Sequence, residues 1–278
     1  MFSRFSNCLG ILATSTACLH GGETAASIMT GPEPVPILSV DVGMTVADQY
    51  MTRGFVVQDE GISYQPHLDL EANFHQGDGF IHSASVLVGL WSVISSSPYG
   101  DGGNRFTEFD YGTGVTVGFA RRWTFTTFYN RWTSPAGAYG DGHWLNGTIE
   151  YDDQGLLHGN FSFNPFIQIT HDLETASASG LCIEPGFRPT HIFFQDSEMP
   201  FTGALLVMAG LGSGYYGDDY GYLAIGPQVS LPLTFMDASA GDWTLSADCL
   251  YYDYGRSVTA YNKKSRDLFF SISLNIGF

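Results

Sequence analysis

The last eleven residues of the chain, Leu268–Phe278, read LFFSISLNIGF and alternate between apolar and small or polar side chains. Neighbouring side chains of a β-strand point to opposite faces, so this alternation predicts a strand with one apolar and one polar face. The length of the stretch matches the roughly 9–11 residues with which a tilted strand crosses a membrane. The end of the chain therefore predicts a transmembrane strand.

The same two-residue period returns along the rest of the chain, for example over Leu38–Ala47 and Tyr64–Phe74. The alternating segments predict about twelve strands, an even number such as closed bacterial barrels use. We expect an all-β fold, a single closed antiparallel up-and-down transmembrane β-barrel, with about ten strands as the alternative if the poorly alternating segment 180–188 is not one. The expected strands are 37–47, 63–75, 80–94, 106–118, 122–132, 143–152, 161–172, 180–188, 203–213, 220–235, 243–254 and 267–278.

The polar faces of these segments separate a membrane barrel from a soluble β-sandwich. A sandwich usually carries Lys and Glu on its outer face, whereas this chain has only two lysines, Lys263 and Lys264. Charged residues make up 14% of the chain, below the roughly 25% of ordinary soluble proteins. The pattern predicts a watery lumen lined by Ser, Thr, Asn, Asp and Glu, and an apolar exterior in contact with outer-membrane lipid.

Charge and hydropathy exclude two other classes. The net charge is −17, and nucleic-acid binding needs clustered Lys and Arg to neutralise phosphates, so no nucleic-acid partner is expected. Beyond the first residues, no apolar run approaches the roughly 18 residues of a transmembrane helix. Without such a run, a chain can span lipid only as a closed barrel, because every backbone polar group must be paired there.

The N-terminal residues have the features of an export signal. Arg4 precedes an apolar stretch over residues 8–19, and small residues offer a cleavage site before Ser27. Lipoprotein processing at Cys18 and a buried N-terminal helix are the two alternatives. We expect a signal peptide over 1–26, a short periplasmic lead-in over 27–36, and a barrel over 37–278 in the outer membrane of a Gram-negative-type envelope.

The connections fit this arrangement when both termini lie on the periplasmic side. The odd-numbered connections, beginning with 48–62, then face outward, and they are rich in Gly, Asp, Tyr and Ser as exposed loops should be. The even-numbered connections are short turns apart from 189–202, whose length the sequence does not explain. Aromatic residues near predicted strand ends, among them Trp123, Trp144 and Tyr151, are expected to form interfacial girdles.

Two features of the sequence are similar to known outer-membrane proteins. A final strand that ends in an aromatic residue, here Phe278, resembles the signal that the outer-membrane assembly machinery recognises, so this machinery is an expected partner. The opening of the chain resembles a family of uncharacterised bacterial outer-membrane β-barrel proteins, which begin with a strand, a Tyr-x-x-Arg-Gly turn and a second strand. The matching residues are Ser39-Val40-Asp41-Val42-Gly43, Tyr50-Met51-Thr52-Arg53-Gly54-Phe55 and Tyr64-Gln65-Pro66, and, more loosely, Asn164-Pro165-Phe166 with His171-Asp172.

The resemblance implies an outer-membrane barrel without an assigned activity, and it supplies no catalytic residues. Within the motif formed by Tyr50, Arg53 and Gly54, the glycine permits a tight turn. The arginine could pair with a lumen carboxylate such as Asp69. An exposed loop arginine is the alternative interpretation.

No catalytic, cofactor or metal site is expected from the motifs. Barrel lipases need a close Ser–His pair, but His82 and Ser83 are adjacent and would point to opposite faces of a strand. Neither a His-Glu-x-x-His sequence nor a calcium loop occurs, and the glycine pattern at 212–217 lacks the helix that a dinucleotide needs. Cys182 and Cys249 fall on opposite faces of strands that are not neighbours, so both are expected to be free thiols.

One set of side chains suggests a function. By the alternation of each strand, a series of carboxylates falls on the inward face of the barrel, and carboxylate-lined pores favour cations. Pairing of these acids with arginines inside a filled barrel is the alternative. The expected function is thus a narrow, porin-like pore for small cations or solutes; the other readings are a non-conducting structural or interaction barrel and a lipid-acting enzyme. The expected lumen acids are Asp41, Asp69, Glu71, Glu108, Asp110, Glu150, Asp152, Glu184 and Asp248.

Overall fold

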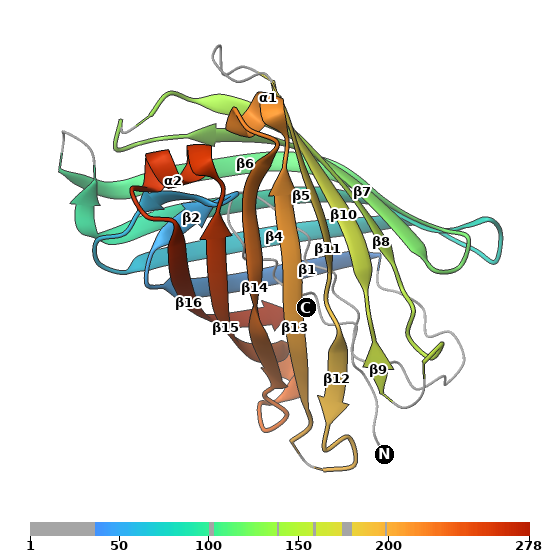
Figure 1. Cartoon of the computed structure of the whole chain (residues 1–278). Helices are drawn as coiled ribbons and strands as arrows, with labels where there is room; N and C mark the ends of the chain where they lie inside the picture. Colours follow the sequence, from blue (N-terminus) through green and yellow to red (C-terminus); the bar gives the residue numbers. More distant parts are fainter. Residues whose placement is uncertain (1–36, 100–102, 138, 158–159, 174–179, 198) are drawn as a thin grey trace.

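A computed structural model describes residues 37–99, 103–137, 139–157, 160–173, 180–197 and 199–278 (Figure 1). The expected signal peptide and lead-in lie outside this part of the chain. Twelve strands form the wall of a closed antiparallel barrel, as the sequence predicts. They are β1 (Leu38–Ala47), β4 (Ser63–Gln76), β5 (Ile81–Tyr99), β6 (Asn104–Phe119), β7 (Trp123–Thr133), β8 (Gly142–Tyr151), β10 (Pro165–Asp172), β11 (Leu181–Phe187), β13 (Phe201–Leu211), β14 (Tyr220–Pro232), β15 (Asp242–Tyr254) and β16 (Arg266–Gly277).

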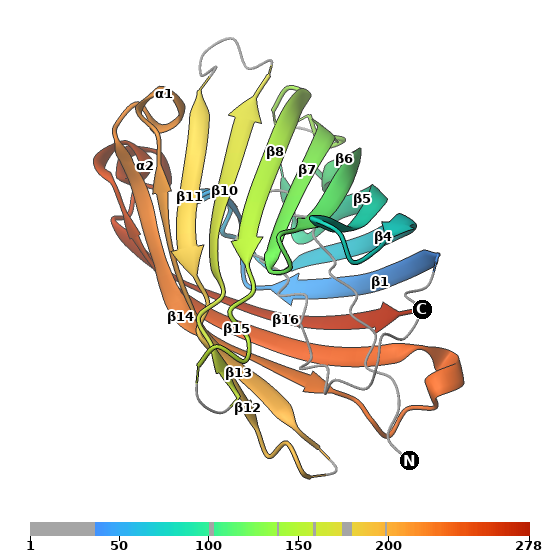
Figure 2. The same ribbon diagram turned by 90° about the vertical axis from the view of Figure 1, so that its right-hand side faces the viewer.

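The last strand closes the barrel. β16 pairs with β15 on one side and with β1 on the other, and β1 also pairs with β4. At the seam, Thr45 lies opposite Ser273, and the Phe278 N–H donates to the Val40 carbonyl at 2.8 Å. Figure 2 shows the sweep of the wall from β11 to β1 and its continuation through β16 to β13. Closure leaves no wall strand with an unpaired edge, which spanning a bilayer requires.

The segment 180–188, the weakest of the expected strands, is β11 and pairs with both β10 and β13. The ten-strand alternative is therefore wrong. The long connection 189–202 also has an explanation, since β12 (Thr190–Phe193) continues β11 beyond Arg188. β12 pairs with β13 and with β9 (Phe161–Ser162), which precedes β10 in the same way. Part of that connection is thus a strand.

The two faces of the wall differ as the alternation predicts. On β1, Val42, Met44 and Val46 are 38%, 45% and 36% exposed, whereas Thr45 between them is fully buried. On β16, the outward Leu268, Phe270 and Ile272 are likewise exposed, while the residues between them are buried. A continuous apolar exterior on a closed barrel suits lipid and not water.

Extra elements gather at one end of the barrel, called here the hairpin end. They are the hairpin of β2 (Tyr50–Thr52) and β3 (Phe55–Gln58), α1 (Ser213–Tyr216) and α2 (Arg256–Asn262) (Figure 1). β1 begins and β16 ends at the opposite end, the terminal end, where η1 (Ala238–Ala240) also lies. Neither α-helix in the described part of the chain is long and apolar enough to cross a membrane.

Candidate functional site: the barrel lumen

The hairpin β2–β3 enters the lumen from the hairpin end. Its turn residues Arg53 and Gly54 have positive φ angles of 46° and 81°, and Thr52 lies opposite Phe55. Two residues with positive φ are typical of a tight two-residue hairpin turn, so the motif is a turn, as its glycine predicts. Tyr50 and Met51 are completely buried. The connection 48–62 is therefore not a wholly exposed loop.

Arg53 lies inside the barrel and is only 3% exposed. Its Nη2 donates to Asn146 Oδ1 at 3.2 Å, and its guanidinium stacks 4.0 Å from the centre of the Trp144 ring. The exposed-loop interpretation of Arg53 is therefore wrong, and these contacts, rather than Asp69, are the partners that the structure gives it. Burial opposes the charge, but Tyr215 and Glu184 more than offset this effect, so the pKa of Arg53 is raised and the side chain stays charged.

The hairpin is held on several sides. Asn262 of α2 donates to the Gly54 carbonyl at 2.8 Å and accepts from the Val56 N–H at 2.9 Å. On the opposite side, the ring of Tyr50 packs against Trp91 of β5, with centroids 5.7 Å apart. These contacts hold β3 against α2 and β2 against the wall.

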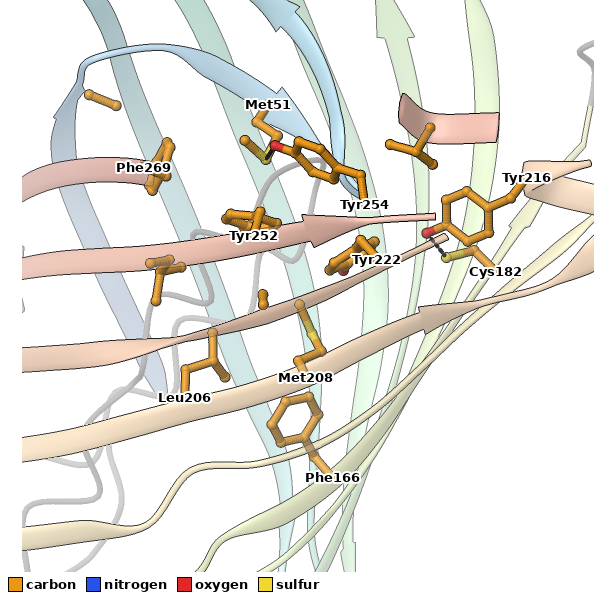
Figure 3. Packing of buried hydrophobic residues seen from close by; sticks show 14 residues of the cluster. Met51, Phe166, Cys182, Leu206, Met208, Tyr216, Tyr222, Tyr252, Tyr254 and Phe269 are labelled. Atoms are coloured by element: carbon orange, nitrogen blue, oxygen red, sulfur yellow. Dashed lines mark hydrogen bonds between the residues drawn. The ribbon is translucent and has the colours of Figure 1, made fainter. Parts of the chain in front are cut away.

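Figure 3 shows the apolar surface on which the hairpin rests. Met51 points toward Tyr254, whose hydroxyl lies 3.7 Å from the methionine sulfur. Beside it, the Tyr216 hydroxyl of α1 contacts the Cys182 sulfur at 3.1 Å and donates to the Arg53 carbonyl at 3.2 Å. The hairpin therefore rests on one buried cluster of aromatic and aliphatic side chains from β10, β11, β13, β14, β15 and β16, with α1 and α2.

Eight of the nine expected lumen carboxylates lie on the inward face of wall strands. The exception is Asp152, which follows the end of β8 and is exposed; its Oδ1 accepts the Gln154 N–H within the turn. The prediction failed there because β8 ends one residue before Asp152. The inward carboxylates are Asp41, Asp69, Glu71, Glu108, Asp110, Glu150, Glu184 and Asp248.

Three of these carboxylates lie on the parts of β6 and β11 nearer the hairpin end. The hydroxyls of Tyr139 and Tyr222 donate to Glu108 and Glu184, and Asn130 donates to Asp110 at 2.8 Å. All three acids are buried. Each therefore has a neutral hydrogen-bond donor, and Arg53 supplies positive charge nearby.

The other five lie nearer the terminal end and have more varied surroundings. Asp248 accepts from Gln228 at 2.8 Å and from Ser271 at 2.9 Å, and Ser85 donates to Glu71 at 2.5 Å. Arg188 reaches into the lumen over the Phe166 ring, 5.8 Å from its centre. These carboxylates are all partly exposed.

Sequence reasoning missed one inward side chain beside them, His67. Its Nε2 lies 2.9 Å from Asp41 Oδ1, and Asp69 is close by. These three side chains come from two strands, so no linear motif finds them. Their spacing in the sequence becomes informative only when the register of β1 and β4 is known.

Two further expectations concern single side chains. Trp144 does not join an interfacial girdle, because it faces inward and is 6% exposed, whereas Trp123 faces outward and packs against Tyr151 with centroids 4.8 Å apart. Within the described chain, Cys182 and Cys249 are free thiols, as expected.

No family model and no curated protein matches this chain in sequence. In shape it is similar to solved outer-membrane proteins. One is an outer-membrane channel from Pseudomonas putida F1, with a TM-score of 0.48, 12% identity, and 88% of this chain and 97% of that one covered. Another is the beta domain of the Bordetella autotransporter BrkA, with a TM-score of 0.46, 10% identity, and 86% and 98% covered.

A third is the KdgM porin, solved in complex with disordered oligogalacturonate, with a TM-score of 0.40, 9% identity, and 86% and 99% covered. The class of the present protein follows from the closed wall and the apolar exterior of its own barrel. The chain is a transmembrane β-barrel.

Proposed function

We propose that the barrel is a narrow pore that favours cations and that the β2–β3 hairpin limits its conductance. The supporting observation is the charge of the lumen. The eight expected carboxylates that face inward, together with the buried Asp172 of β10, outnumber the inward arginines Arg53 and Arg188. An excess of fixed negative charge raises the local concentration of cations and lowers that of anions.

The hairpin is the narrowing element of this pore. Its residues contact β5 through Tyr50, β8 through Arg53 and β15 through Met51, so it reaches across the lumen. An ion that passes this level must travel beside the hairpin. We therefore expect a conductance well below that of an open barrel with the same number of strands.

Planar bilayer recording tests the pore. The purified barrel, inserted under a tenfold KCl gradient, is expected to give discrete current steps with a reversal potential of the sign for cations. Neutralising two partly exposed lumen acids in Glu71→Gln/Glu150→Gln should move that potential toward zero. Asp152→Asn is the matched control, because Asp152 is an exposed carboxylate outside the lumen. An unchanged potential in the double variant would refute the charge argument.

A non-conducting structural or interaction barrel is the second candidate. The complete burial of Tyr50 and Met51 favours it, because a hairpin packed this tightly could seal the lumen. The Arg53→Ala variant separates the two candidates. If neither the native barrel nor the loosened variant gives steps above baseline, the pore proposal fails and the second candidate stands.

We also infer that the assembly machinery recognises the final strand. β16 closes the barrel against β1, and the Phe278 side chain is 60% exposed, so it is available to a partner. Removing Phe278 should slow insertion of the chain in cells, measured as the share of heat-modifiable barrel on gels. Phe235→Ala is the control, because Phe235 is an exposed aromatic at the same end of the barrel. Equal insertion of both variants would contradict the inference.

Membership of the family with the Tyr-x-x-Arg-Gly opening is likewise a proposal, supported by the tight turn at Arg53 and Gly54. We propose no catalytic residues. Mass spectrometry of outer-membrane lipids after incubation with the barrel tests this, since a changed lipid mass would reveal the lipid-acting enzyme.

A further inference from the structure

Three side chains with metal-binding chemistry converge between β1 and β4 on the inward face. Asp41 and Asp69 lie directly opposite each other in the pairing of the two strands. His67 precedes Asp69 by two residues, so its side chain points to the same face. One possible ligand atom from each residue can be chosen so that all three lie within 4.8 Å of one another.

The charges of this group are not balanced by the protein alone. Carboxylates directly opposite each other on neighbouring strands repel. The His67 side chain is 7% exposed and contacts Asp41 at 2.9 Å, whereas Asp69 Oδ1 is buried and accepts no hydrogen bond. Arg188, the arginine nearer the terminal end, interacts with Glu150 and Asp248 instead. The basic group beside the two carboxylates is therefore His67 alone among the side chains named here, so one imidazole faces two acids.

A fourth oxygen, from Asn275 of β16, lies beside His67. Asn275 lies opposite Gly43, which lies opposite His67 on the other side. A Cβ atom at Gly43 would lie 2.1 Å from Asn275 Oδ1 and 2.4 Å from His67 Cε1, so only glycine lets these two side chains meet. Asn275 Oδ1 is also buried without a hydrogen-bond partner. This second orphaned oxygen is independent of the acidic pair.

We propose that Asp41, His67 and Asp69, with Asn275 as a fourth donor, bind a divalent cation, best of all Zn²⁺. Zinc takes an imidazole nitrogen and carboxylate oxygens at about 2.0–2.2 Å in a tetrahedral arrangement. Calcium prefers about six to eight oxygens, more than this group supplies, and no nitrogen. The cation places positive charge between the opposed carboxylates and gives a partner to Asp69 Oδ1 and Asn275 Oδ1. The site does not depend on whether the barrel conducts.

Calorimetric titration of the metal-free barrel in detergent with ZnCl₂ tests the site. We expect one zinc per chain, and Asp69→Asn and His67→Gln should each weaken binding at least tenfold, because each removes a donor. Glu71→Gln is the matched control: it neutralises an inward carboxylate on the same strand, one that already accepts a hydrogen bond from Ser85. The Glu71→Gln variant should bind zinc with the same affinity as the native chain. MgCl₂ and CaCl₂ should bind more weakly than ZnCl₂.

Heat-modifiable migration on gels confirms that each variant is folded. If one variant fails to fold, Asn275→Ala provides the same test, because it removes the donor that β16 contributes. Zinc binding that is absent from the native barrel, or that survives all folded donor variants unchanged, overturns the site. The titration needs no bilayer, so a barrel that binds zinc but passes no current refutes the pore alone.

Discussion

The two halves of the lumen surround their inward carboxylates in different ways. Near the hairpin end, a loop folds inward and brings Arg53 to within reach of wall residues, and hydroxyl or amide donors meet Glu108, Asp110 and Glu184. Near the terminal end, no described loop enters, and the wall alone surrounds Asp41 and Asp69. The carboxylates of the first half are buried, with neutral donors and Arg53 beside them, whereas those of the second half are partly exposed and outnumber Arg188 and His67.

The difference shows what strand alternation can and cannot achieve. Alternation places carboxylates on the inward face at every depth, but it does not supply their counter-charge. A folded loop supplies Arg53 in one half. In the other half Arg188 and His67 supply part of the counter-charge, and we propose that cations supply the rest. We therefore expect variants in the hairpin half to change mainly the stability of the barrel. Variants in the terminal half should change mainly its cation binding and its ion selectivity.

The largest expected effect follows removal of the inserted charge in Arg53→Ala. The variant loses a hydrogen bond from a charged group and a stacked guanidinium, and it leaves Glu184 without its cation; together these should cost about 4 kcal/mol. Urea unfolding followed by tryptophan fluorescence measures the loss. Arg53→Lys should recover part of it, because lysine keeps the charge but not the planar stack on Trp144. Arg256→Ala, at an exposed arginine on α2, is the control and should be neutral.

The next effect tests why the hairpin turn needs glycine at position 54. The reason is either the backbone conformation alone or also the close approach of Tyr222. An alanine Cβ at Gly54 would lie 2.7 Å from Tyr222 Cδ1, and φ is +81°. Gly155 has a similar φ of +74° with nothing within 4 Å. We expect Gly155→Ala to cost about 1 kcal/mol from backbone strain and Gly54→Ala about 3 kcal/mol from strain plus overpacking. Equal losses in urea unfolding would show that the contact with Tyr222 is unimportant.

The two halves should respond with opposite signs when a carboxylate is neutralised. Glu184→Gln removes a counter-charge of the buried Arg53 and should destabilise the barrel by about 2 kcal/mol. Asp69→Asn, measured in metal-free buffer, relieves repulsion with Asp41 and should stabilise it by about 1 kcal/mol. Chemical unfolding in the presence of a chelator gives both values. The same sign for both variants would remove the contrast between the halves.

The wall was predictable from sequence because its signal is local. The expected strand 37–47 is β1 (Leu38–Ala47), and 243–254 is β15 (Asp242–Tyr254), since the period of two is visible within each segment. The same period of two also predicted correctly that eight of the expected carboxylates face inward. Asp152 failed because strand ends are less regular than strand centres, and one residue decides between lumen and turn.

The contents of the lumen were not predictable, because they depend on contacts between distant segments. Arg53 meets Asn146, 93 residues away, and no local pattern distinguishes a loop that folds inward from one that remains exposed. β2 and β3 are too short to show a period of their own. His67 and Asp41 become neighbours only through strand register. The strands of the barrel are thus predictable from short segments, whereas the site depends on how the strands pair.

The smallest expected effect concerns Asp48, in the turn between β1 and the hairpin. Partial burial raises its pKa above the ordinary value of 3.8, although its Oδ1 accepts the Phe270 N–H at 3.1 Å. A carboxyl with a raised folded-state pKa binds its proton more tightly when folded. Its ionised form therefore costs stability, and this cost grows as the pH rises from 3.8 through the folded-state pKa.

Asp48→Asn keeps an acceptor for the Phe270 N–H and removes the charge. The variant should therefore be more stable than the native barrel at neutral pH, by about 0.5 kcal/mol or less because solvent screens this half-exposed position. The gain should disappear below pH 3.8, where both chains are uncharged at residue 48. Urea unfolding at pH 7 and pH 3 measures the difference. A gain of the same size at both pH values would assign it to hydrogen bonding instead of charge, and the hairpin half would then carry no electrostatic cost at its rim.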